Sequence, residues 1–325
     1  MSRRAVARGP LLAASLLLAA GPARAAAPEI ASFLYLLASP TGVVHSTWAG
    51  VTYDRAHDET FVVGDGTARI FDRSGMEVYR FGRDDALGTI IRVAPLPDGD
   101  LVVISWLEGR RTLSRCDYRG QLLERIELKG IPPEVPRPFD PDTVEALGDA
   151  LYFAETSGGR VLVTDLGGEY RAYYDLPALA KLPRKSEGVG GVSVAADGQL
   201  LFTIPTLYSA FVVTPGGAVR QFGVKGSRPG RFNIVGKMVS DEQGNLFLID
   251  RLRCVVMVFD RDLKFLAEFG YRGPNPGNMA GPFDVAVGNG KLFVSQARNI
   301  GVKVYKLSLP GSGPEQAAPS AQGTP

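Results

Sequence analysis

The fold is decided by the stretch Gly244-Asn245-Leu246-Phe247-Leu248-Ile249-Asp250. It starts in the tight turn Gln243-Gly244 and continues as a strongly apolar run of strand length. Glycine, asparagine and aspartate favour such a turn because they tolerate the positive φ angles of a two-residue hairpin. A third apolar run at residues 255–260 and a more polar one at 265–269 follow. The stretch therefore predicts a unit in which four short strands follow one another.

The same unit recurs six times along the chain. Its turns are His57-Asp58, Asp98-Gly99, Gly148-Asp149, Asp197-Gly198, Gln243-Gly244 and Asn289-Gly290. They are spaced by roughly 41 to 50 residues, which is typical of a four-stranded propeller blade. No stretch after residue 25 has a convincing helical periodicity, so the chain is predicted to be all-β. The sequence thus predicts a six-bladed β-propeller of four-stranded blades.

The sixth unit lacks a fourth strand of its own. An unassigned strand-like run, IASFLYLL, lies at residues 30–37. We expect this run to add to the last blade and close the ring, because closure removes sheet edges that would otherwise invite aggregation.

The two ends of the chain differ from the repeats. Residues 1–25 have the pattern of a signal peptide: Arg3, Arg4 and Arg8 precede a short apolar run, and Ala23-Arg24-Ala25 fits a cleavage site. The apolar run is shorter than the roughly twenty residues of a membrane span, although a retained anchor is the alternative. Residues 26–309 are assigned to the propeller, and residues 310–325 are predicted to be a disordered tail. An exported chain would be periplasmic or extracellular, and both the Sec and the twin-arginine routes stay open.

Composition limits the partners. The formal net charge is +2 and the charges of both signs are interleaved, which gives no electrostatic case for nucleic acid. No other long apolar segment exists, so no membrane span is expected once the signal is removed. Cys116 and Cys254 fall in units two and five, on opposite sides of a six-fold ring. We therefore expect two separate, buried thiols, well beyond disulfide reach.

Two inter-blade segments carry a family resemblance. Their sequences are Phe222-Gly223-Val224-Lys225-Gly226-Ser227-Arg228-Pro229-Gly230 and Phe269-Gly270-Tyr271-Arg272-Gly273-Pro274-Asn275-Pro276-Gly277. Both fit F-G-x-[KR]-G-x-x-P-G. Together with residues 244–250 and Val258-Phe259-Asp260, they resemble the NHL-repeat β-propellers. The resemblance covers nearly all of the mature chain and implies the fold rather than one function, because such propellers include enzymes, protein-binding modules and RNA-binding modules.

Residues that are absent from the sequence exclude several catalytic mechanisms, including one known among NHL-like enzymes. NHL-like amidating lyases hold zinc with several histidines, whereas His45 and His57 are the only two here, so three-histidine zinc chemistry is excluded by count. No G-x-S-x-G elbow or P-loop is present. The predicted export and the near-neutral charge disfavour an RNA-binding function.

Propellers usually bind ligands at one mouth of the central channel, where the inner strands begin. Alignment of the six units on their turns places one residue of each unit at this mouth. These residues are Gly50, Arg92, Asp142, Gly191, Lys237 and Asp284. We expect Arg92 to neighbour Asp142 and Lys237 to lie one blade from Asp284. The glycines of Gly188-Val189-Gly190-Gly191 indicate a close backbone approach at the channel.

The ends of the second strands return to the same face. They bring Asp65, Ser105, Glu155, Asp250 and Ser295. One interpretation is a polar-ligand or metal site at the mouth. The other is that the charges pair around the rim and that the strand-end aspartates accept hydrogen bonds from loop amides. The family resemblance favours the second interpretation for Asp65 and Asp250.

Two functional hypotheses follow. The leading one is a non-catalytic binding or scaffold propeller that needs no cofactor and recognises a protein, or a saccharide, on this face. Its predicted binding residues are Arg92, Trp106, Asp142, Glu155, Tyr208, Lys237, Asp250 and Asp284. The alternative is a metal-dependent hydrolase or lyase that resembles the gluconolactonases. In it Asp142, Glu155, Asp250 and Asp284 would bind calcium or another divalent metal, although the asparagine ligand usual there has no aligned counterpart.

Overall fold

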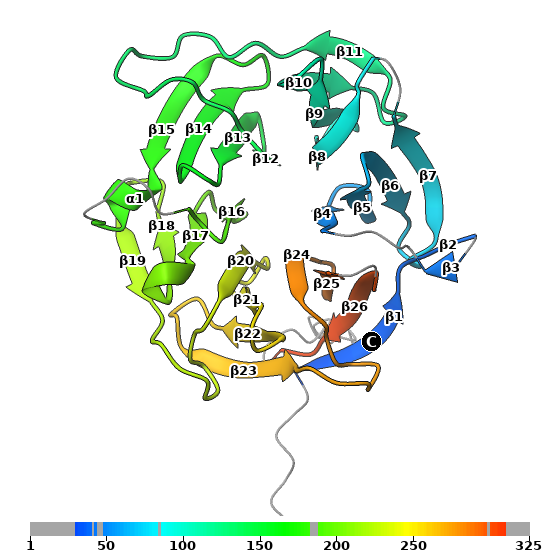
Figure 1. The fold of residues 1–325 in the computed structure, drawn as a ribbon, viewed down its shortest axis with the longest axis vertical. Helices are drawn as coiled ribbons and strands as arrows, with labels where there is room; N and C mark the ends of the chain where they lie inside the picture. Colours follow the sequence, from blue (N-terminus) through cyan, green and yellow to red (C-terminus); the bar gives the residue numbers. More distant parts are fainter. Residues whose placement is uncertain are drawn as a thin grey trace, which may run out of the picture.

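The computed structural model describes residues 30–40, 42–43, 48–83, 86–182, 188–297 and 300–309. In this part of the chain, six four-stranded antiparallel sheets stand around a central axis (Figure 1). The predicted six-bladed, all-β propeller is therefore confirmed. The predicted signal peptide, the predicted tail at residues 310–325 and His45 lie outside the described residues.

Each of the first five blades consists of four consecutive strands. Blade 1 contains β4 (Gly50–Asp54), β5 (Glu59–Gly64), β6 (Thr67–Phe71) and β7 (Glu77–Gly82), and blade 2 contains β8 (Thr89–Pro95), β9 (Leu101–Leu107), β10 (Arg110–Cys116) and β11 (Leu122–Arg125). Blade 3 contains β12 (Thr143–Leu147), β13 (Ala150–Glu155), β14 (Arg160–Asp165) and β15 (Tyr170–Asp175), and blade 4 contains β16 (Gly191–Val194), β17 (Leu200–Ile204), β18 (Ser209–Val213) and β19 (Val219–Phe222). Blade 5 contains β20 (Val235–Ser240), β21 (Leu246–Asp250), β22 (Val255–Phe259) and β23 (Phe265–Gly270).

Blade 6 joins the two ends of the described chain. It contains β24 (Pro282–Gly288), β25 (Lys291–Gln296), β26 (Val302–Leu307) and, outermost, β1 (Ala31–Leu36). Strand β1 runs antiparallel to β26, with Phe33 opposite Tyr305 (Figure 1). The predicted closure of the ring by the N-terminal run is thus confirmed.

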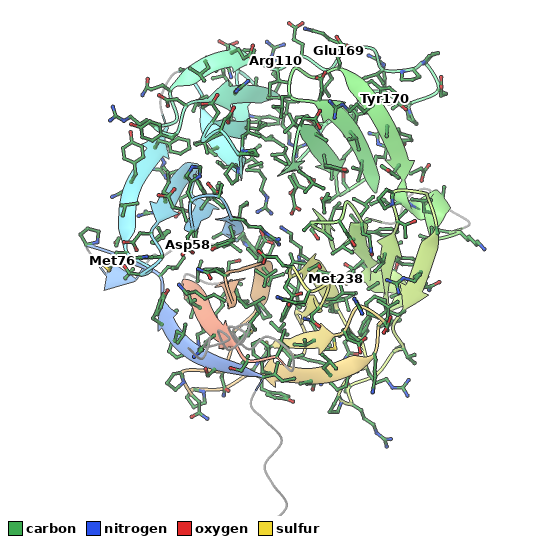
Figure 2. All side chains as sticks on the ribbon, turned by 180° about the vertical axis from the view of Figure 1, so that it is seen from behind. Asp58, Met76, Arg110, Glu169, Tyr170 and Met238 are labelled. Carbon is green, nitrogen blue, oxygen red and sulfur yellow. The ribbon has the colours of Figure 1, made fainter. Side chains whose placement is uncertain are left out.

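The other elements are small. A hairpin of β2 (Ala38–Ser39) and β3 (Gly42–Val43) lies at the rim beside Met76 (Figure 2). The helix α1 (Leu176–Leu179) and the 3₁₀ turn η1 (Pro205–Leu207) sit in loops of blades 3 and 4. No helix in the described ranges is long and apolar enough to cross a bilayer.

The hydrophobic core lies between neighbouring blades. The described residues form six buried apolar clusters, one at each junction. At the junction of blades 4 and 5, for example, Val212 packs with Met238 and Leu248, and Met238 is labelled in Figure 2. The second strands are almost wholly buried because both of their faces meet other sheets. The inner strands, in contrast, present their remaining polar side chains to the channel.

The two cysteines behave as predicted. Cys116 ends β10 in blade 2, and Cys254 immediately precedes β22 in blade 5. Both are buried thiols that form no disulfide.

Candidate functional site

Asp284, at the start of β24, is the centre of the channel mouth. Its side chain is almost completely buried. The Oδ2 atom accepts a hydrogen bond from Arg92 Nη1 at 2.6 Å and one from the Val51 amide at 3.1 Å. The Oδ1 atom accepts from the Val285 amide at 2.8 Å and lies 3.6 Å from Lys237 Nζ. One carboxylate therefore ties together strands of blades 1, 2, 5 and 6.

Lys237 continues this network to the other side of the ring. Its Nζ atom lies 2.9 Å from Glu145 Oε1 on β12, and Glu145 Oε2 accepts a hydrogen bond from the Val194 amide at 2.8 Å. The result is a chain of ion pairs, Arg92–Asp284–Lys237–Glu145, which we call the channel network. It links blades 2, 6, 5 and 3 across the central axis.

The network has an approximate two-fold pattern. Each cation reaches over a glycine of the preceding blade to a carboxylate one blade further back. Arg92 passes Gly50, where a Cβ atom would lie 1.8 Å from its Nη1 atom. Lys237 passes Gly191, where a Cβ atom would lie 2.6 Å from the Lys237 Cα atom. The predicted close approach at Gly191 is thus confirmed, and both glycines make room for the cations.

The network keeps Asp284 and Lys237 charged. Burial by itself would raise the pKa of Asp284, but Lys237 and Arg92 hold this pKa below its ordinary value. Burial would likewise lower the pKa of Lys237, but Asp284 and Glu145 raise it overall. Opposite charges in a desolvated site favour the charged form of each partner. The mouth is therefore a set of fixed charges near neutral pH.

The glycine at position 191 provides a direct test of this packing. We expect Gly191→Ala to lower the free energy of unfolding by about 1–3 kcal/mol, because the new methyl group meets Lys237 backbone that cannot turn away. Urea denaturation measures the loss. The matched control is Gly216→Ala, because the nearest atom to a Cβ there is 3.9 Å away and this substitution should be neutral or slightly stabilising. Equal stabilities of the two variants would contradict the tight approach.

Asp142 and Glu155 lie on the same face but outside the channel network. Asp142 accepts a hydrogen bond from the Thr156 hydroxyl at 2.6 Å and another from the Thr156 amide. Burial raises the pKa of Asp142 above its ordinary value. Glu155 forms an ion pair with Arg160. The sequence predicts that Arg92 neighbours Asp142, and the charge of Arg92 does act on the pKa of Asp142. The ion pair of Arg92 is with Asp284, however, and Glu145 is the acid that blade 3 contributes to the channel network.

The strand-end aspartates have different surroundings. Asp250 is fully buried and accepts hydrogen bonds from the amides of Leu252, Arg253 and Asn233. It has the loop-capping role that the family resemblance implied. Asp65 lies in the β5–β6 turn with a φ of 53°, and its carbonyl oxygen accepts a hydrogen bond from Arg83. Among the hydrogen bonds of the described residues, the loop amides bond the carboxylate of Asp250, whereas Asp65 accepts through its carbonyl oxygen.

The four carboxylates of the calcium alternative are held by four separate sets of partners. Asp142 bonds Thr156, Glu155 pairs with Arg160, Asp250 caps a loop, and Asp284 belongs to the channel network. Within the ranges that the structure describes, no three His, Cys, Asp or Glu side chains come together in a way that could hold a metal ion. The structure does not gather the predicted ligands.

Aromatic side chains surround the mouth. Trp106, at the end of β9, is 47% exposed. Tyr208 follows η1, and Lys225 Nζ lies 4.7 Å from the centre of its ring. The alignment on turns missed Trp48, which is 60% exposed and packs edge-on against Phe283 with ring centres 5.0 Å apart. Its signal was its place, two residues before the inner-strand glycine Gly50.

The channel also contains a cavity on the opposite side of the network. It has a volume of about 290 Å³ and is lined by all six inner strands, with Glu145 and Lys237 among its polar groups. It extends toward the hairpin turns, such as Pro97 and Gly148. Side chains of the inner strands project into the centre of the ring (Figure 2). Two members of the channel network, Glu145 and Lys237, thus line this cavity.

Comparison with known proteins defines the class of fold. No protein-family model matches the chain, and no curated protein does. A protein of unknown function from Bacteroides thetaiotaomicron is similar in structure, with a TM-score of 0.59, 15% identity, and coverage of 86% of this chain and 76% of the other. A streptogramin B lyase structure gives a TM-score of 0.53 at 15% identity, covering 82% and 85%. A chain of the nidogen–laminin complex gives a TM-score of 0.52 at 13% identity, with coverage of 73% of this chain and 83% of the other.

These identities are low, so the matches show the fold alone. The chain is a six-bladed β-propeller whose structural neighbours differ in function. One neighbour is a lyase, and another comes from a protein–protein complex.

Proposed function

We propose that this chain is an exported, non-catalytic propeller of the NHL-repeat type that binds a protein partner on its channel face. We define the channel face as the side of the ring at which the inner strands begin. In this proposal residues 1–25 are a signal peptide, residues 26–309 are the binding domain, and residues 310–325 are a disordered tail. The protein acts in the periplasm or outside the cell.

The observation that carries the proposal is a set of exposed apolar side chains around the mouth. Trp48, Trp106, Ile234 and Leu252 are each between 47% and 60% exposed. Each lies just before an inner strand, at the end of a second strand or in the turn after it, which places all four on the channel face. Large apolar side chains gathered on one face mark interaction sites, and tryptophan is enriched among residues that dominate binding energy.

The polar groups of the mouth support binding rather than turnover. The carboxylates of Asp284, Glu145 and Asp250 are engaged by cations or backbone amides, so they position strands and loops. A rigid rim with fixed charges suits recognition of a surface, because little is lost in ordering it. A saccharide stacked on Trp106 is the alternative occupant of the same face.

Site-specific photo-crosslinking tests the proposal. A photoreactive amino acid placed at Trp106 or Leu252 should capture one and the same protein from the envelope fraction. The control position is Tyr118, which is 59% exposed but lies beyond the other end of the blade. We expect no capture of that partner from Tyr118. Capture of nothing from the channel face, or the same yield from Tyr118, would refute the proposal.

A further inference from the structure

Arg251 is a half-buried cation of the channel face for which the described residues provide no ion pair. It directly follows Asp250, and its Nη2 atom donates a 3.4 Å hydrogen bond to the Gly190 carbonyl. Its Nε atom is buried and has no hydrogen-bond partner within the part of the chain that the structure describes. Among the ion pairs of the described residues, none includes Arg251, whereas Arg92 and Lys237 each have one.

Arg251 takes no part in the channel network. Arg92 and Lys237 form the ion pairs with the two carboxylates of that network, Asp284 and Glu145. Burial lowers the pKa of Arg251, and the charge of Asp284 only partly offsets this effect. A guanidinium nevertheless stays protonated in proteins, so its desolvation cost remains uncompensated. An added anion would remove that cost.

A glycine and an aromatic ring lie beside the Arg251 side chain. A Cβ atom at Gly236 would lie 3.0 Å from Arg251 Nε, so the glycine leaves this position open. The guanidinium carbon lies 5.1 Å from the centre of the Phe283 ring, and Trp48 packs on the edge of the same ring. A ligand that reaches Arg251 would therefore meet aromatic surface as well as a positive charge.

We propose that Arg251 is an anion receptor that binds a carboxylate carried on an apolar or aromatic group, with Trp48 and Phe283 contacting the apolar part. A guanidinium offers a planar fork that matches a carboxylate in a two-point contact. The carboxylate belongs either to an acidic side chain of the partner or to a small organic acid. This inference rests on the proposed function, because it names the chemistry recognised at the same face.

Intrinsic fluorescence gives the first test, because the chain has two tryptophans, Trp48 and Trp106. In a Trp106→Phe background, Trp48 is the sole reporter. We expect 3-phenylpropionate to cause a saturable change in emission. The neutral 3-phenylpropanamide should bind at least about ten-fold more weakly. Arg251→Gln should weaken binding of the acid to the level of the amide. The same response to acid and amide, or an unchanged response in Arg251→Gln, would overturn the inference.

Two controls separate binding from folding. Arg119→Gln changes an exposed arginine beyond the other end of the blades and should leave the titration unchanged. The unfolding midpoint of Arg251→Gln should be equal to or higher than that of the parent chain, because the substitution removes a buried, unpaired charge. If Arg251→Gln fails to fold, Arg251→Lys serves in its place: it keeps the charge but loses the fork, and should bind the acid more weakly than the parent.

Crosslinking in the Arg251→Gln background identifies the source of the carboxylate. A yield from Leu252 that falls about ten-fold assigns the carboxylate to the partner. An unchanged yield, with acid binding still dependent on Arg251, assigns it to a small organic acid. The two proposals can fail separately. Crosslinks without any preference for acid would leave the proposed function standing and remove this inference, whereas acid binding without crosslinks would remove the protein partner.

Discussion

Replacement of Asp284 by asparagine is expected to lower the free energy of unfolding by about 3–5 kcal/mol. Asparagine keeps the size of the side chain, but the Val51 and Val285 amides donate to different oxygens of Asp284, and the single carbonyl oxygen of asparagine replaces only one of these acceptors. The substitution also removes the negative charge shared by Arg92 and Lys237. Loss of one member of a buried network leaves the others desolvated and uncompensated. Urea denaturation at neutral pH, followed by circular dichroism, measures the change.

The control for Asp284→Asn is Glu242→Gln. Glu242 is 65% exposed and lies 3.9 Å from Arg55, so its ion pair contributes at most about 0.5 kcal/mol. The pH dependence provides a further check. Because the folded-state pKa of Asp284 lies below its ordinary value of 3.8, its stabilising effect is present above pH 3.8 and is lost as the pH falls through the folded-state pKa. The difference between parent and variant should therefore shrink in acid. A difference that does not depend on pH would contradict the electrostatic explanation.

The fold could be predicted because its signals are local and repeated. Each hairpin turn, such as Asp98-Gly99 or Asn289-Gly290, provides residues that tolerate positive φ, and the apolar strand follows at once. Six repeats at a blade-like spacing determine the number of blades. The closing strand was predictable because residues 30–37 had no place in any other unit.

The partners within the mouth could not be predicted in the same way. Alignment on turns assumes that the inner strands have the same register, but β8, β20 and β24 contain irregularities at Arg92, beside Lys237 and at Asp284. A bulge re-aims the side chains beyond it. Strand β12 has no such irregularity, so Asp142 turns to Thr156 while Glu145, three residues later, meets Lys237.

Contacts between side chains of different blades could not be predicted from the sequence either. Trp48, Arg251 and Phe283 come from blades 1, 5 and 6, and no local pattern links them. Each lies one or two residues from a position that the alignment did single out: Gly50, Asp250 and Asp284. The sequence therefore indicates the neighbours of these three residues along the chain, whereas the three-dimensional arrangement was needed to show that the three side chains lie together.

Removal of the closing strand is the other change from which we expect a large effect. A chain that starts at Ala38 lacks β1 and Leu37, whose side chain is fully buried and whose amide donates to the Val302 carbonyl at 3.0 Å. Loss of the buried Leu37 side chain alone should cost about 2–5 kcal/mol. The exposed edge of β26 would add to this cost and would pair with other molecules. We expect lower stability in urea and aggregates in size-exclusion chromatography, compared with a chain that starts at Ala26.

A point variant and a peptide separate closure from a general effect of truncation. Leu34→Ser changes a side chain of β1 that is 40% exposed, and it should alter stability by no more than about 0.5 kcal/mol. A synthetic peptide of residues 26–37 should restore stability to the truncated chain, because β1 pairs with β26 through an antiparallel ladder that needs no covalent link. If the truncated chain unfolds at the same urea concentration as the longer one, β1 does not hold the ring closed. Rescue by the peptide would show that the pairing of β1 with β26 closes the ring and that this pairing joins the two ends of the chain.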